Sequence, residues 1–253
     1  MVIPGALAVA RDFDGFAQLL GARFSVHTIE RRGRGASGDR ADAYSIDREC
    51  EDVAALQAAT GATLVFGHSF GGLIALEHAR LSHLYTKVAV YEPGISPRTE
   101  WVEAARAQLA RGRELDAFVT FARGANPAAG GTPSWLLKVI LPLAIRGEER
   151  KRKQQLLPTA IREHLAAARL DGPGARYESI TADVLLLTGA KRRGPDDGAL
   201  ARVASSTPGA ALVTLPGLDH FGPGKKPQVV APAVSAFFAD AVQEMQSEPR
   251  RRQ

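Results

Sequence analysis

The sequence has one cysteine, Cys50, among its 253 residues, and only 6% of the residues are aromatic. A single cysteine excludes an internal disulfide framework, so a packed core must hold the chain together, and the length is ample for one. No run approaches the roughly 18 consecutive apolar residues that a membrane-spanning helix requires. Residues 1–10 are apolar but lack a basic segment and contain Pro4-Gly5, which favours a strand and a turn over a secretory signal. We therefore expect a cytoplasmic protein without membrane association.

The charge is weakly one-sided, since 32 Lys and Arg against 27 Asp and Glu give a net charge of +5. Much of the excess lies in residues 146–153 and in the arginines of residues 250–252. Few aromatic side chains are available to stack on bases, which argues against a nucleic-acid partner. The net positive charge is compatible with a weak preference for anionic substrates.

Short apolar runs alternate along the chain with longer segments of helical period. This alternation indicates an α/β fold, with a mostly parallel, doubly wound sheet of about six strands. The expected strands are residues 2–3, 24–29, 63–66, 87–91, 184–187 and 211–215. The expected helices of this core are residues 12–20, 46–59, 72–81, 198–205 and 227–244.

The interval 94–182 contains no strand pattern and instead has helical period. A compact domain rarely contains a structureless loop of this length, so we interpret the interval as a helical lid. Its expected helices are residues 101–109, 114–122, 135–145 and 154–170. The lid interrupts a core formed by residues 1–93 and 183–245, and residues 246–253 are expected to be a disordered tail.

Ser69 lies in Gly67-His68-Ser69-Phe70-Gly71, directly between a predicted strand and a predicted helix. A serine raised on such a sharp turn needs glycine neighbours, because side chains there would collide with nearby backbone. The helix that follows offers N–H groups and a positive dipole to a developing oxyanion. This context predicts Ser69 as a nucleophile, with a structural turn serine as the alternative, and His68 is expected to line the pocket.

A serine hydroxyl is a weak nucleophile at neutral pH and needs an imidazole to accept its proton. His220 is the candidate, because it follows the last predicted strand in a loop that opens at the same sheet edge as Ser69. The other five histidines lie in a strand, on or beside helices, or in the serine turn. The sequence has neither a metal-binding histidine cluster nor a phosphate-binding Gly-rich loop followed by lysine, so no metal or organic cofactor is expected.

The serine turn, the late histidine and the insertion resemble the α/β-hydrolase superfamily, specifically its lidded, small-molecule esterase and haloperoxidase-like branch. The resemblance covers residues 3–241 and implies the α/β-hydrolase fold, with the lid between the family's sixth and seventh strands. By position in that family, the backbone N–H groups of Ala6 and Phe70 form the oxyanion hole. Leu7 is also expected to contact the substrate, as is Trp135, an apolar side chain of the expected lid, for which packing inside the lid is the alternative. The segment from Arg31 to Ser37 resembles the family's Gly-rich loop, for which a turn is the expected role.

The acid that completes the triad is ambiguous. The family usually places it shortly after the seventh strand, but Gly189 is followed here by Lys191, Arg192 and Arg193. Some family members carry the acid at the end of the sixth strand, where Glu92 stands. Glu92 is the preferred acid, Asp196 or Asp197 is the alternative, and a third reading assigns the role to none of them.

The family's first two strands have no counterpart in this chain, and its third is reduced to residues 2–3. Residues 24–29 would then form an edge strand, which invites pairing with a second copy. A homodimer is one hypothesis, and a trimmed or misassigned N-terminus is the other.

These residues predict a serine hydrolase that cleaves an ester, lactone or thioester of a hydrophobic small molecule through an acyl-enzyme. The alternative is a non-hydrolytic protein of the same fold, either a cofactor-free lyase or cyclase or a small-molecule binding protein.

Overall fold

The computed structural model describes residues 1–38, 44–95, 99–126, 129, 131–170, 175–191 and 197–247. Its centre is a parallel sheet of five strands in the order β1-β2-β3-β4-β5. The strands are β1 (Val2–Ile3), β2 (Leu64–His68), β3 (Lys87–Tyr91), β4 (Asp183–Gly189) and β5 (Ala210–Leu215). The α/β class predicted from the alternating pattern is confirmed.

Residues 24–29, which the sequence suggested as a further strand, do not form one. They touch β1 through an isolated bridge between Val2 and Thr28. Val2 N donates to His27 O at 2.8 Å, and Ile29 N donates to Val2 O at 3.0 Å. Because β1 has only two residues, it is too short to form an extended ladder of hydrogen bonds with residues 24–29. The pairing of this edge with a second copy stays a hypothesis.

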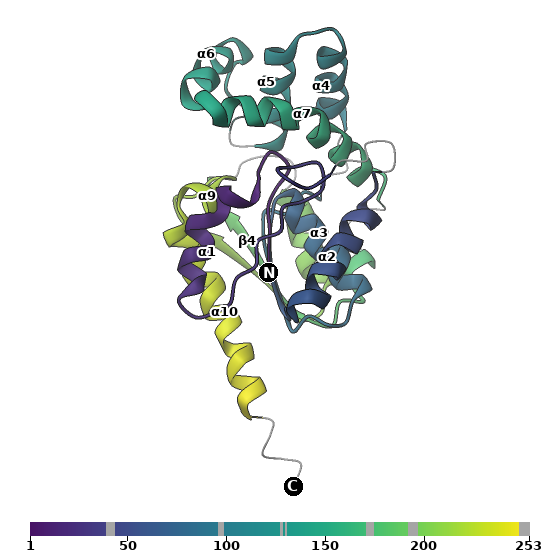
Figure 1. Cartoon of the computed structure of the whole chain (residues 1–253), viewed down its shortest axis with the longest axis vertical. Coiled ribbons are helices and arrows are strands. Elements are labelled where there is room, and N and C mark those ends of the chain that lie inside the picture. The colour runs from purple at the N-terminus through teal and green to yellow at the C-terminus, as the bar shows by residue number, and fades with distance from the viewer. Residues whose placement is uncertain are drawn as a thin grey trace.

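Helices cover both faces of the sheet (Figure 1). On one side lie α1 (Asp14–Gly21), α9 (Gly222–Lys225) and α10 (Pro227–Ser247), and on the other lie α2 (Ile46–Thr60) and α3 (Phe70–Leu81). A 3-10 helix, η1 (Ala10–Phe13), precedes α1, another, η4 (Ala175–Tyr177), precedes β4, and α8 (Asp197–Ser206) connects β4 to β5.

Side chains alternate between the two faces along each strand, as expected for strands buried on both sides. In β3, Val88 and Val90 join the core beside α2 and α3, whereas Ala89 and Tyr91 join the core beside α1 and α10. Cys50 is buried on α2, where burial raises the pKa of its thiol to about 12. The cysteine therefore stays protonated and packs as a small apolar residue.

Four helices lie between β3 and β4: α4 (Glu100–Ala110), α5 (Glu114–Ala125), α6 (Ser134–Ala144) and α7 (Gly147–Ala167). We call them the helical insertion. They form a layer beyond one end of the sheet, with α6 at the outer side and α7 along the side that faces the sheet (Figure 1). The helix α7 begins seven residues before the predicted position 154, because the basic segment 147–153 forms its first two turns.

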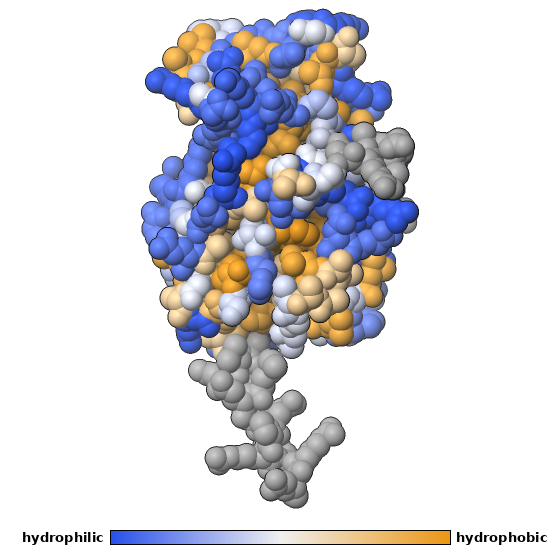
Figure 2. All heavy atoms as spheres, in the orientation of Figure 1, coloured by the Kyte–Doolittle hydropathy of each residue, from blue (hydrophilic) through white to orange (hydrophobic). Residues whose placement is uncertain are grey.

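Hydrophobic and hydrophilic side chains alternate over the surface of the insertion (Figure 2). Exposed apolar side chains gather on α6, at Trp135, Val139, Ile140 and Leu143. None of the helices in the described ranges is both long and apolar enough to cross a membrane.

Gly71 lies where the first turn of α3 passes closest to the chain after β1. A Cβ at this position would overlap the carbonyl oxygen of Ile3 and lie 2.5 Å from that of Pro4. Since only backbone surrounds the site, we expect Gly71→Ala to lower the free energy of unfolding by about 3 kcal/mol in urea denaturation. Gly21→Ala is the control, because a Cβ on Gly21 meets nothing within 4 Å. Equal stability of the two variants would contradict this packing.

Candidate active site

Ser69 stands between the end of β2 at His68 and the start of α3 at Phe70. Its backbone has φ 53° and ψ −122°, a strained conformation for a residue with a side chain. A Cβ on Gly67 would lie 2.5 Å from the carbonyl oxygen of Gly71, so the turn needs glycine there. The local structure is the sharp strand-to-helix turn that the sequence predicted.

The structure brings Ser69, His220 and Glu92 together from three separate loops. His220 Nε2 lies 3.0 Å from Ser69 Oγ, across 151 positions of sequence. His220 Nδ1 lies 2.9 Å from Glu92 Oε2. The carboxylate can only accept a hydrogen bond, so this geometry assigns the proton of the neutral imidazole to Nδ1 and leaves Nε2 to accept the serine proton.

Glu92 directly follows β3 and has a φ of 43°, the left-handed region that favours glycine. Its other carboxylate oxygen, Oε1, accepts from Gly189 N at 2.9 Å and from Thr188 Oγ1 at 3.2 Å. The end of β4 therefore holds the Glu92 carboxylate, the candidate acid, in place. Asp196, the alternative acid, lies outside the described residues, as does the side chain of Asp197.

Two side chains from neighbouring strands hold the loop that carries His220. His68 Nε2 donates to His220 O at 2.7 Å, and Tyr91 Oη donates to Asp219 O at 2.7 Å. Burial lowers the pKa of His68 to about 3, so its ring is neutral. The sequence expected His68 at the pocket; the structure buries it directly behind His220. The contribution of Tyr91 had no sequence signal, because a strand tyrosine does not reveal which loop it meets.

The two expected oxyanion donors both lie next to Ser69. Phe70 is the first residue of α3, so its N–H has no partner within the helix. A Cβ on Gly5 would lie 3.1 Å from Ser69 Cβ, so the loop that contains Ala6 passes against the serine. Within the described part of the chain, neither the Ala6 nor the Phe70 amide donates a hydrogen bond.

The other expected substrate contacts have different outcomes. Leu7 is half-buried and packs against the core that includes Phe70. Trp135 is 68% exposed on α6, the helix at the outer side of the insertion (Figure 1). The indole was expected near the substrate because its helix belongs to the insertion, but sequence periodicity does not show which helix faces the sheet.

A side chain that the sequence did not single out, His164 of α7, lies over Phe70 instead. Its ring centroid is 5.3 Å from that of Phe70, 5.3 Å from Trp101 and 5.0 Å from Phe121. Burial lowers the pKa of His164 to about 4, and its Nδ1 donates to Ala160 O at 2.8 Å. The insertion thus places a neutral, mostly aromatic surface beside the serine turn. Among the described residues, no three His, Cys, Asp or Glu side chains gather as metal ligands do.

Comparisons with known proteins agree with this fold. A family model described as "Alpha/beta hydrolase family" matches residues 1–233. The solved structure of an alpha/beta hydrolase from Sphaerobacter thermophilus DSM 20745 is 29% identical, with a TM-score of 0.76 over 94% of this chain and 91% of that chain. No curated protein matches the sequence.

Two further solved structures share the fold at lower identity. A thermophilic esterase from Thermogutta terrifontis is 18% identical, with a TM-score of 0.68 over 94% of this chain and 88% of that chain. The enol-lactonase from Burkholderia xenovorans LB400 is 17% identical, with a TM-score of 0.70 over 94% of this chain and 90% of that chain. The fold expected from the sequence resemblance is confirmed.

The two buried imidazoles make stability depend on pH. His68 and His164 have pKa values of about 3 and about 4 in the fold, against 6.5 for an unperturbed histidine. Below pH 6.5 the unfolded chain therefore binds protons that the folded chain does not, so stability falls as the pH falls. At pH 5 we expect a loss of about 2 kcal/mol per histidine relative to pH 7, measured by urea denaturation. In His164→Phe the part of this loss that His164 causes should disappear. A free energy of unfolding that does not change between pH 7 and pH 5 would contradict the burial of the two imidazoles.

Proposed function

The chain belongs to the alpha/beta hydrolase family, and we propose that it is a serine hydrolase that cleaves an ester, lactone or thioester through an acyl-enzyme. The observation that carries the proposal is the continuous set of hydrogen bonds from Ser69 Oγ through His220 to Glu92, at 3.0 Å and 2.9 Å. A nucleophile, a base and a group that orients the base are the parts that acyl transfer to serine needs.

In the first half of the reaction, Ser69 Oγ attacks the substrate carbonyl carbon while its proton passes to His220 Nε2. Glu92 stabilises the imidazolium that forms and keeps the ring in the orientation that presents Nε2. The Ala6 and Phe70 amides donate to the oxyanion of the tetrahedral intermediate, an effect of about 3 kcal/mol per donor. The intermediate collapses when the imidazolium gives its proton to the leaving alcohol or thiol, and the acyl group remains on Ser69.

In the second half, a water molecule takes the place of the leaving group. His220 Nε2 accepts a proton from the water as its oxygen attacks the acyl carbon, and the same two amides stabilise the second oxyanion. The imidazolium then returns the proton to Ser69 Oγ as the carboxylic acid departs. Every proton moves through Nε2, which explains why both ring nitrogens of His220 need fixed partners.

The surroundings of the serine turn favour a substrate whose acyl or alcohol group is apolar. The neutral imidazole of His164 lies over Phe70, and the rings of Trp101 and Phe121 pack against that imidazole, so the insertion supplies all three rings. Apolar walls with a few placed polar groups are typical of small-molecule sites. We assign the insertion the role of a lid over this site.

An activity-based probe tests the nucleophile. A fluorophosphonate should label the wild-type protein once, on the peptide that contains Ser69, and Ser69→Ala should abolish labelling, as read by gel fluorescence and mass spectrometry. Ser205→Ala, at an exposed serine on α8, should label like the wild type. A folded wild-type protein that resists the probe and hydrolyses no aryl ester would instead favour the binding-protein or lyase alternative.

Steady-state kinetics on a short-chain aryl ester test the acid. Glu92→Gln should lower kcat by about 1,000- to 10,000-fold, because the amide no longer stabilises the imidazolium or secures its tautomer. Asp183→Asn, at the opposite end of β4, is the control and should change kcat little. If Asp196→Asn caused the large loss and Glu92→Gln did not, Asp196 would be the acid.

A further inference from the structure

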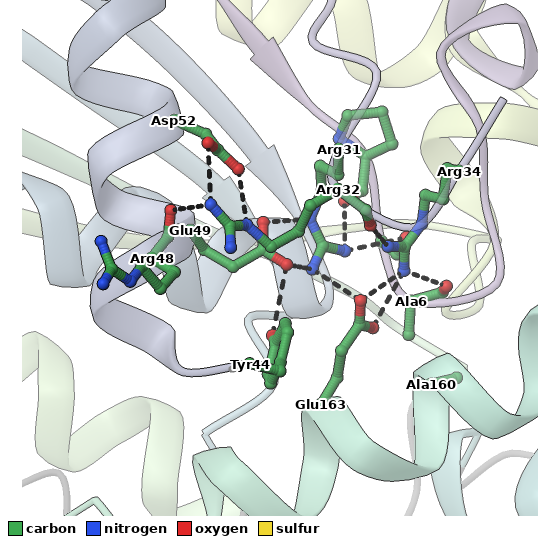
Figure 3. Close-up of polar contacts among 12 residues, drawn as sticks. Ala6, Arg31, Arg32, Arg34, Tyr44, Arg48, Glu49, Asp52, Ala160 and Glu163 are labelled. Atoms are coloured by element: carbon green, nitrogen blue, oxygen red, sulfur yellow. Dashed lines mark hydrogen bonds and ion pairs between the residues drawn. The ribbon is translucent and has the colours of Figure 1, made fainter. Parts of the chain in front are cut away.

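Four charged side chains are buried together beside the loop that follows β1 (Figure 3). Arg31 and Arg34 come from the Gly-rich segment after residues 24–29, Glu49 from α2 and Glu163 from α7. Both arginine side chains are 0% exposed, and neither carboxylate exceeds 1%. Two positive and two negative charges cancel, as buried ions require. For the segment from Arg31 to Ser37 the sequence suggested only a turn, but two of its side chains belong to this buried ion cluster.

Glu163 lies between the two arginines. Arg31 Nη2 donates to Glu163 Oε1 at 3.0 Å and to Glu49 Oε1 at 2.6 Å. Arg34 Nη2 donates to Glu163 Oε2 at 2.9 Å. Glu49 is also held by Arg31 Nε, at 3.2 Å, and by the hydroxyl of Tyr44, at 3.2 Å. The positions of both guanidinium groups therefore depend on a carboxylate that the insertion supplies.

Other donors of the two arginines reach backbone carbonyls of the loop after β1, while Arg34 Nη1 donates to Arg32 O at 3.0 Å. Arg31 Nη1 donates to Pro4 O at 3.4 Å and to Gly5 O at 3.3 Å. Arg34 donates to Ala6 O from Nη2, at 2.5 Å, and to Ala8 O from Nε, at 3.0 Å. Along the chain, these carbonyls lie on both sides of the Ala6 amide.

Peptide geometry connects these contacts to the oxyanion hole. The carbonyl of Gly5 and the N–H of Ala6 belong to one peptide plane, and the described residues contain no cis peptide bond. In a trans plane the two groups point in opposite directions, so Arg31, by holding the Gly5 carbonyl, turns the Ala6 N–H away from itself. The guanidinium of Arg31 also lies 4.8 Å from the centre of the Phe70 ring. Arg31 thus contacts the Gly5 carbonyl, which shares a peptide plane with the Ala6 amide, and the ring of Phe70.

The helix α7 also contacts the loop after β1 and the following helix η1 directly, at one point each. Lys153 Nζ donates to Leu7 O at 3.3 Å, and Arg152 Nη2 pairs with Asp12 Oδ1 at 2.5 Å. Together with Glu163, these contacts join the insertion to residues 4–12 over nearly three turns of one helix.

We propose that Glu163 is a positioning residue, which couples the seating of α7 to the direction of the Ala6 amide through Arg31 and Arg34. With α7 seated, the arginines are neutralised and fixed, and the loop carbonyls are held. With α7 displaced, the buried arginines lose a carboxylate and the loop loses its orientation. The oxyanion hole is then complete only when the insertion is closed over the serine. This inference rests on the proposed function, since it assigns the amide to a hydrolytic site.

The test compares Glu163→Gln with the wild type and with Glu77→Gln. Glu77 is an equally buried carboxylate, bonded to Arg176, Arg80 and Tyr177, but it has no contact with the loop after β1. For Glu163→Gln we expect kcat on an aryl ester to fall by about 100-fold with KM little changed, because a small misplacement of the oxyanion donor has that order of effect. Glu77→Gln should match the wild type in kcat.

An inhibitor pair separates the oxyanion hole from general stability. A trifluoromethyl ketone adds to the serine and forms an oxyanion, whereas the matching secondary alcohol only occupies the pocket. In Glu163→Gln the inhibition constant of the ketone should rise by the same factor by which kcat falls, with the alcohol unaffected. Equal behaviour of the Glu163 and Glu77 variants, or wild-type ketone binding in Glu163→Gln, would overturn the proposal.

A second variant covers the case in which Glu163→Gln does not fold. Lys153→Met removes a partly exposed contact to the same loop and should weaken ketone binding by about 10-fold without weakening alcohol binding. Unchanged ketone binding would overturn the coupling. Failure of the proposed function looks different, because the wild-type protein would then neither turn over the ester nor bind the ketone more tightly than the alcohol.

Discussion

The register of three parallel strands is the constraint on which the site depends. His68 of β2 lies beside Tyr91 of β3, and Tyr91 lies beside Leu187 of β4. The residues that follow, Ser69 and Glu92, leave the sheet at the same level as the end of β4. A parallel sheet opens its ligand site at this edge because every strand ends there. The same strands hold the histidine loop through His68 and Tyr91, so the sheet fixes all three members of the proposed triad.

The loop that carries the proposed oxyanion donor Ala6 is held by a different means. The strand β1 is only two residues long, and the loop after it has no sheet partner beyond Ile3. Besides a local bond from Ala8 N to Gly5 O, its carbonyls are bound by Arg31 and Arg34, which both donate to Glu163 of the insertion. A buried ion cluster stabilises a fold less than an apolar core of the same size, but it is directional. The protein thus uses apolar packing to build the sheet and charge to orient a short loop.

The sequence predicted the parts whose signals are local. The serine turn, with glycines between a strand and a helix, pointed to Ser69 as the candidate nucleophile, and the position of His220 after the last strand pointed to the candidate base; the structure places the two side chains 3.0 Å apart. Glu92 was preferred over Asp196 because some members of the family that the sequence resembles carry the acid at that strand end, and that edge also faces the serine turn. The sequence could not show that residues 24–29 would fail as a strand, since that depends on the length of β1. It also could not show that α7, rather than the α6 that carries Trp135, faces the serine.

The role of Arg31 and Arg34 was also beyond the sequence. Glu163 lies 132 positions after Arg31 in the sequence, and a glutamate in a helix normally faces solvent. Only the folded chain places it between two arginines.

A crystal structure of the protein phosphonylated on Ser69 tests the central claim most directly. The account predicts that one phosphonyl oxygen lies about 2.7–3.1 Å from both the Ala6 and Phe70 amides, with His220 still bonded to Glu92. An adduct whose oxygens face solvent, or a His220 ring held by another acid, would contradict it.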